Sequence, residues 1–140
     1  MTKIIPSSQK IRCGLVGFGR VAGNHVDAMA DHKDDIELTA ICDNRDDVLA
    51  QATKDTGAKG YKTLEEMLDA GGFDIVTLCS PSGLHPIQGQ QVANAGYHVI
   101  TEKPMAVDWQ GGLDFVNGCK KAGVKLFVVK QNRLNDTCQA

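Results

Sequence analysis

The chain has 140 residues and a mass of 15.0 kDa, the size of one ordinary domain that buries a core without disulfides or metals. Its 42% hydrophobic and 23% charged residues are typical of a globular rather than a disordered protein. A net charge of −2, from 15 Lys and Arg against 17 Asp and Glu, argues against a large basic surface for nucleic acid or an anionic membrane and leaves room for a small basic site.

The sequence carries no sign of membrane insertion or export. No apolar run approaches the roughly 18 residues that a spanning helix needs, and the polar segment Met1–Lys10 lacks the apolar centre of a signal peptide. Five cysteines without CxxC spacing favour neither a disulfide framework nor a zinc site, and no metal is expected. We expect a soluble cytoplasmic protein in which the thiols of Cys13, Cys42 and Cys79 are buried as small hydrophobes.

Two kinds of segment alternate along the chain and predict an α/β fold, a doubly wound parallel sheet of the Rossmann type with strand order 3-2-1-4-5-6. Near-continuous apolar runs are typical of strands buried on both faces of such a sheet. They are Ile11–Val16, Ile36–Cys42, Asp74–Cys79, Tyr97–Thr101 and Lys125–Val129, with a short third strand near Gly60–Lys62.

Between these runs, apolar residues recur at helical spacing. Thr63–Glu66 has the composition of a capping box, and Pro86 suits the first turn of a helix. Glycines at 57, 71, 96 and 123 follow helical stretches, where a left-handed cap is favourable. The expected stripes are Val21, His25 and Met29 within Arg20–His32, then Leu64, Met67 and Leu68, and finally Trp109, Leu113 and Val116.

A glycine-rich turn between the first strand and the first helix is the strongest local signal. It reads Gly17–Phe18–Gly19–Arg20–Val21–Ala22, a G-x-G-x-x-A pattern in which Ala replaces the third Gly. The first Gly permits the tight turn, the second lets the backbone approach a pyrophosphate, and free N–H groups at the helix start hold the phosphates. The pattern predicts dinucleotide binding, although a glycine-rich turn can be simply a turn.

Asp43 follows the second strand, 21 residues after Ala22, where a carboxylate accepts hydrogen bonds from the ribose hydroxyls of a dinucleotide. The same carboxylate repels a 2′-phosphate and so favours NAD over NADP. Arg45 is an opposing feature, because a nearby Arg can accommodate that phosphate. The alternative is that Asp43 caps the helix beginning near Asn44.

Two further motifs follow the fourth and fifth expected strands. The segment from Cys79 to Pro86 (Cys-Ser-Pro-Ser-Gly-Leu-His-Pro) can direct hydroxyls, amides and an imidazole toward a ligand. A turn without ligand contacts, in which the His caps a helix, would have a similar sequence. In Glu102–Lys103–Pro104, a partly desolvated lysine at a strand end could act in proton transfer, whereas most lysines face solvent.

These motifs resemble the amino domain of the glucose–fructose oxidoreductase and inositol dehydrogenase family of nicotinamide-dependent sugar oxidoreductases. The resemblance covers about residues 11–135 and implies NAD as cofactor, NADP being less favoured, and a sugar substrate. It places Lys103 near the nicotinamide and the reacting hydroxyl, linked to proton transfer. The matching residues are Gly17 and Gly19, Asp43, Pro81 with His85, and Glu102–Lys103–Pro104. The cofactor contacts it implies are Gly17, Phe18, Gly19, Arg20, Val21, Asp43, Asn44, Arg45, Cys79, Ser80, Pro81, Ser82, His85, Glu102, Lys103 and Gln131.

The segments Ser80–His85 and Val129–Asn135 look like the branch of this family that oxidises the 3-hydroxyl of UDP-N-acetylglucosaminuronic acid in surface-polysaccharide synthesis. That likeness implies substrate contacts from Lys103, Asn132 and Arg133, while a plain surface charge is the alternative for Arg133.

Family members are about twice this length and have a carboxyl-terminal substrate domain, so we expect a fragment that binds cofactor with little turnover. The expected division is a tail at residues 1–9, a dinucleotide-binding domain at 10–130 and the start of a connection at 131–140. A homo-oligomer is expected, without nucleic acid or membrane as partner. Two alternatives stay open: a non-catalytic NAD(H)-binding or sensing module, and a domain for another nucleotide such as S-adenosylmethionine.

Overall fold

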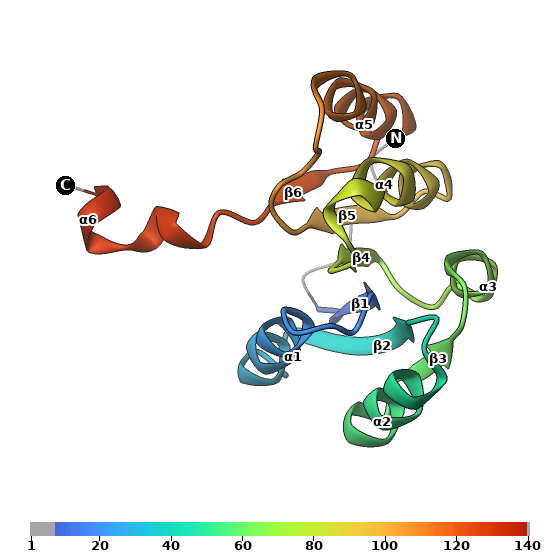
Figure 1. Ribbon diagram of the computed structural model, residues 1–140. Coiled ribbons are helices and arrows are strands. Elements are labelled where there is room, and N and C mark those ends of the chain that lie inside the picture. Colours follow the sequence, from blue (N-terminus) through green and yellow to red (C-terminus); the bar gives the residue numbers. More distant parts are fainter. Residues whose placement is uncertain (1–7, 140) are drawn as a thin grey trace.

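Six parallel strands form one sheet in the order β3-β2-β1-β4-β5-β6, in a computed structural model that describes residues 8–139 (Figure 1). This order confirms the predicted doubly wound sheet. The strands are β1 (Ile11–Val16), β2 (Ile36–Cys42), β3 (Lys59–Tyr61), β4 (Ile75–Leu78), β5 (His98–Thr101) and β6 (Leu126–Val128).

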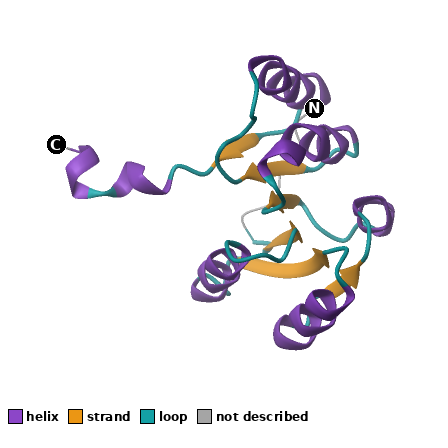
Figure 2. Ribbon diagram, in the orientation of Figure 1, coloured by secondary structure: helices purple, strands orange, loops and turns teal. Residues whose placement is uncertain are grey.

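Helices cover both faces of this sheet (Figure 2). Buried side chains of α1 and α2 pack against one face, and those of α3, α4 and α5 pack against the other, where the largest core cluster lies. The α-helices are α1 (Ala22–Asp31), α2 (Asp46–Thr56), α3 (Leu64–Ala70), α4 (His85–Asn94), α5 (Trp109–Ala122) and α6 (Asp136–Gln139), with short 3₁₀ turns at Ser82–Leu84 and Gln131–Leu134. No helix in the described range is long and apolar enough to cross a membrane.

The helix signals in the sequence act largely as predicted. Thr63 accepts a hydrogen bond from the backbone N–H of Glu66, whose side chain in turn accepts one from the backbone N–H of Thr63, and this capping box begins α3. Gly57 and Gly123 end α2 and α5 in the left-handed conformation. Gly71 also has a positive φ, but its ψ of −152° lies outside that region.

The predicted core stripe of α5 is wrong. Trp109 is 80% exposed, and Leu113 and Val116 are 39% and 45% exposed, whereas Phe115 is fully buried. The reason lies on α4: a Cβ at Gly89 would sit 2.1 Å from the ring of Phe115, so the missing side chain makes room for that ring. The α4–α5 packing therefore turns inward the neighbouring face of α5, which carries Gly112, Phe115 and Cys119.

The cysteines agree with the expectation of buried thiols in the main. Cys13 and Cys42 are buried, Cys79 is partly buried, and all are free thiols. Burial, together with the nearby Asp74 carboxylate, raises the pKa of Cys13 to about 12.

Candidate functional site

The turns that carry the predicted site residues lie together at the carboxyl-terminal edge of the sheet. The glycine turn follows β1, Asp43 follows β2, Ser80 follows β4 and Lys103 follows β5. In an open parallel sheet this edge is where ligands bind, beside the central strands at which the strand order reverses. Three of the hollows found among residues 8–139 open along it.

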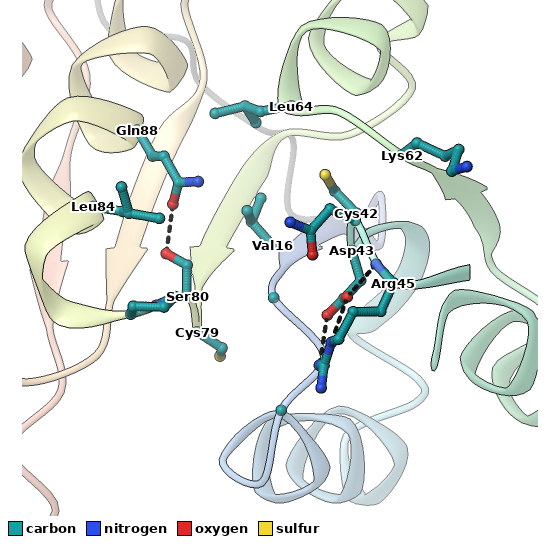
Figure 3. Close-up of a pocket in the computed structure, with 14 residues that line it drawn as sticks. Val16, Cys42, Asp43, Arg45, Lys62, Leu64, Cys79, Ser80, Leu84 and Gln88 are labelled. Atoms are coloured by element: carbon teal, nitrogen blue, oxygen red, sulfur yellow. Dashed lines mark hydrogen bonds and ion pairs between the residues drawn. The ribbon is translucent and has the colours of Figure 1, made fainter. Parts of the chain in front are cut away.

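The first hollow has a volume of about 530 Å³ and brings the glycine turn together with the turns after β2 and β4 (Figure 3). It unites eight of the sixteen residues expected to contact the cofactor. The expected residues that line it are Gly17, Gly19, Asp43, Asn44, Arg45, Cys79, Ser80 and Pro81, while Lys62, Leu64, Leu84 and Gln88 were not anticipated.

The two glycines of the turn serve different purposes. Gly17 has a φ of +84°, and a Cβ there would approach the backbone N of Ser80 to 2.8 Å, so only glycine fits between β1 and the β4 turn. Gly19 has no atom within 4 Å of where its Cβ would lie, which leaves the backbone open to a ligand. The Ala22 side chain is fully buried, and α1 begins without a side-chain cap or an acidic residue in its first turn. Such an uncapped helix start suits an anion.

Asp43 is buried and strongly hydrogen-bonded (Figure 3). Its Oδ2 accepts from the Phe18 backbone N–H at 2.8 Å and from Arg45 Nη2 at 3.1 Å, and its Oδ1 accepts from the backbone N and Nε of Arg45 at 3.0 and 3.1 Å. Burial raises the pKa of Asp43, but the hydrogen bonds from Arg45 and Phe18 and the guanidinium charge outweigh it and hold the pKa below its usual range.

The alternative interpretation of Asp43 as a helix cap is wrong. Helix α2 begins at Asp46, two residues later than expected. Its N-cap residue is Arg45, and no side chain makes a capping hydrogen bond there. Instead, Arg45 holds the carboxylate beside the glycine turn. A carboxylate has about four acceptor sites, and these four donors fill them; two of the donors belong to the Arg45 guanidinium, whose side chain is 55% exposed.

His85 does not face the first hollow, and the expectation that its imidazole meets a cofactor is wrong. The side chain is 1% exposed, with Nδ1 lying 2.9 Å from the Pro104 carbonyl oxygen and Nε2 2.8 Å from that of Ser80. It therefore ties together the turns after β4 and β5. Ser80 donates its hydroxyl to Gln88 on α4, and Ser82 lines none of the three hollows.

A second hollow of about 550 Å³ lies between α1 and the turn after β5, and a third of about 580 Å³ lies beside residues 130–133. Lys103 borders both, and its side chain is exposed, so the partial burial expected of it is not found. The expected residues of the second are Arg20, Val21, Glu102, Lys103 and Gln131, and those of the third are Lys103, Gln131, Asn132 and Arg133.

Residues 11–130 match the GFO_IDH_MocA family, an oxidoreductase family with an NAD-binding Rossmann fold. The chain belongs to this oxidoreductase family. The relatives of known activity include D-glucoside 3-dehydrogenase of Escherichia coli, 30% identical over 84% of this chain and 34% of that protein. Myo-inositol 2-dehydrogenase of Thermotoga maritima is 32% identical over 84% of this chain and 35% of its own length.

Two solved structures of WlbA dehydrogenases, each in complex with NADH and UDP-GlcNAcA, resemble this oxidoreductase domain more strongly. The Bordetella pertussis enzyme is 51% identical over 94% of this chain and 40% of its own, with a TM-score of 0.92. The Chromobacterium violaceum enzyme is 48% identical over 99% of this chain and 41% of its own, with a TM-score of 0.94. The chain thus spans about two fifths of these relatives and carries their NAD-binding part.

The residues of this oxidoreductase domain fit a dinucleotide. Open space beside Gly19 and the Asp43 carboxylate lie at the first hollow, while Arg20 and Val21 at the uncapped start of α1 line the second, so phosphate-binding and ribose-binding groups occur along one edge. His25 is a residue that the sequence interpretation missed as part of the site. Its partner Glu102 lies 77 positions away, so no local pattern reveals the contact.

Proposed function

We propose that this chain is the cofactor-binding part of an enzyme of the UDP-N-acetylglucosaminuronate 3-dehydrogenase type, serving surface-polysaccharide synthesis. The observation that carries the proposal is the 51% identity, over 94% of the chain, to a dehydrogenase crystallised with NADH and UDP-GlcNAcA. In this proposal residues 10–130 bind the cofactor, and residues 131–140 begin a connection to a substrate domain.

The charge of the third hollow supports an anionic sugar nucleotide. Lys103, Lys130 and Arg133 supply three cationic side chains there, with the amides of Gln131 and Asn132 between them. A uronate carboxylate and a diphosphate are the groups that such side chains bind. Asn132 and Arg133 would orient the substrate beside Lys103.

In the proposed reaction, Lys103 handles the proton of the substrate hydroxyl, because it lies at the junction of the second and third hollows. A nicotinamide cofactor held at this edge would supply the hydride acceptor for oxidation of the carbinol carbon. Gly17 and Gly19 form the phosphate turn, and Asp43 holds the adenosine ribose. Arg20, Val21, Glu102 and Gln131 would enclose the nicotinamide half.

Titration of the purified chain with NADH and with NADPH, followed by calorimetry, tests the cofactor assignment. We expect tighter binding of NADH, and a weaker preference in Asp43→Asn, because the carboxylate then no longer repels the 2′-phosphate. Preferential binding of NADPH would mean that Arg45 outweighs Asp43, and absence of binding by both would contradict the proposed site.

The substrate class is tested by titrating the NADH-saturated chain with UDP-GlcNAcA and with UDP-GlcNAc, which lacks the carboxylate. We expect the uronate to bind more tightly and Arg133→Ala to reduce that difference. Equal binding of the two sugars would contradict a uronate substrate.

A further inference from the structure

His25 links the first helix to the motif that carries Lys103. Its Nε2 lies 2.8 Å from Glu102 Oε1, and the two side chains are only 17% and 13% exposed. His25 lies in the first half of α1, whereas Glu102 directly follows β5. The contact therefore joins the helix of the glycine turn to the neighbouring turn of the sheet edge.

The second oxygen of the same carboxylate holds the backbone of the next residue. Glu102 Oε2 accepts from the backbone N–H of Lys103 at 3.2 Å, and the Glu102 backbone N–H donates to the Leu78 carbonyl oxygen at 3.0 Å. The Glu102 main chain is thus fixed to β4, and its carboxylate bridges from His25 to the Lys103 peptide. Each oxygen of the Glu102 carboxylate therefore has its own partner: Oε1 contacts His25, and Oε2 accepts from the Lys103 N–H.

The charges around this bridge explain what His25 contributes. Arg20, Glu102, Lys103 and His25 are the ionisable residues that line the second hollow. Among residues 8–139, the Lys103 ammonium has no ion-pair partner, while the Glu102 carboxylate is in hydrogen-bond contact with His25. Without His25, the largely buried Glu102 carboxylate would lose this contact and attract one of the other cations that line the second hollow, Lys103 or Arg20.

We propose that His25 is a positioning residue that holds the Glu102 carboxylate against the Lys103 backbone and so keeps the Lys103 amine available to the substrate. The proposal rests on the proposed role of Lys103. His25 acts only through Glu102 and touches no reacting atom.

The first arm of the test measures the position of Lys103 without any cofactor. In nuclear magnetic resonance spectra of the 15.0 kDa chain, His25→Ala should shift the Lys103 backbone amide proton upfield, because its carboxylate acceptor moves. His25→Gln, which places a neutral donor near Nε2, should restore most of the shift. His32→Ala, a change of the exposed histidine just after α1, should leave the resonance in place.

The second arm measures ligand binding. His25→Ala should weaken NADH binding by about 3- to 10-fold and leave ADP binding unchanged, because the site proposed for ADP is the first hollow, which neither His25 nor Glu102 lines. In a Glu102→Ala background, His25→Ala should add no further loss.

The arms distinguish the two proposals. Failure of the wild-type chain to bind NADH and ADP would contradict the proposed function. The Lys103 amide resonance would still test the positioning role of His25, because that measurement needs no ligand. An unchanged Lys103 resonance in His25→Ala, an equal shift in His32→Ala, or independent losses in the double variant would overturn the positioning role.

Discussion

The glycines at positions 17 and 19 give opposite predictions for the same added methyl group. Gly17→Ala meets a φ of +84° and the Ser80 backbone at 2.8 Å, so we expect a loss of about 2–4 kcal/mol in the free energy of unfolding. Gly19→Ala meets no atom within 4 Å and should change that free energy by less than about 0.5 kcal/mol.

Gly19→Ala should nevertheless weaken NADH binding by roughly tenfold or more, because in the proposed site the methyl group would enter the space where the pyrophosphate approaches the backbone. Urea denaturation and calorimetry of both variants check the pair. A Gly19→Ala chain that binds NADH as tightly as wild type would place the phosphates elsewhere.

Asp43 should make stability depend on pH. Its native pKa lies below the unfolded value of about 4, so its contribution is complete at neutral pH and is lost as pH falls through the native pKa. We expect Asp43→Asn to cost about 1–3 kcal/mol at pH 7 and clearly less at pH 3. Urea denaturation at both pH values measures this, with the exposed Asp27→Asn as control. An equal cost at both pH values would show that the charge of Asp43 contributes nothing.

At the scale of elements, the α4–α5 contact depends on the absence of a side chain. Gly89→Ala places a methyl group 2.1 Å from the Phe115 ring, and we expect a loss of about 1–3 kcal/mol in stability. Gly23→Ala on α1, where nothing lies within 4 Å, should instead gain about 0.5–1 kcal/mol from helix propensity. Thermal and urea unfolding of the two variants compares them, and a stabilising Gly89→Ala would contradict the observed packing.

The strands and their order were predictable because a parallel sheet buries continuous apolar runs, and its right-handed crossovers leave few arrangements. The inward face of α5 was not predictable. Its stripe of Trp109, Leu113 and Val116 and the Phe115 face have similar helical spacing, and the choice is made by Gly89 on another helix.

The site was predictable to the same degree. The positions of Gly17, Asp43 and Lys103 follow from their place after strands. The partners of Asp43, the burial of His85 and the contact of His25 with Glu102 depend on distant segments, which a single sequence does not reveal.

For the whole molecule, thiol reactivity should report on global unfolding. Burial, with the nearby Asp43 and Glu66 charges, raises the pKa of Cys42 to about 11, and burial beside Glu102 raises that of Cys79 to about 12. Because the thiolate is the reactive form, these cysteines should react slowly with a disulfide reagent at pH 8. Cys138 is exposed and should give one fast phase.

Replacing that exposed residue, as Cys138→Ser, should remove the fast phase and leave the slow ones, which urea accelerates. Stopped-flow absorbance with the reagent in excess measures both. Two or more fast thiols in the native chain would contradict the burial of the core cysteines.

The pairing of β1 with β4 joins two halves of the chain, residues 11–61 and 75–128, along one line of backbone hydrogen bonds. The candidate site straddles this line, with Gly17 and Asp43 on one side and Ser80 and Lys103 on the other. A dinucleotide that contacts both sides would link the two halves. By mass action, its binding would raise the free energy needed to separate and unfold them. Amide hydrogen exchange in β1 and β4 should then slow together as ligand is added. The exchange rate of these two strands would thus report both the occupancy of the site and the stability of the fold.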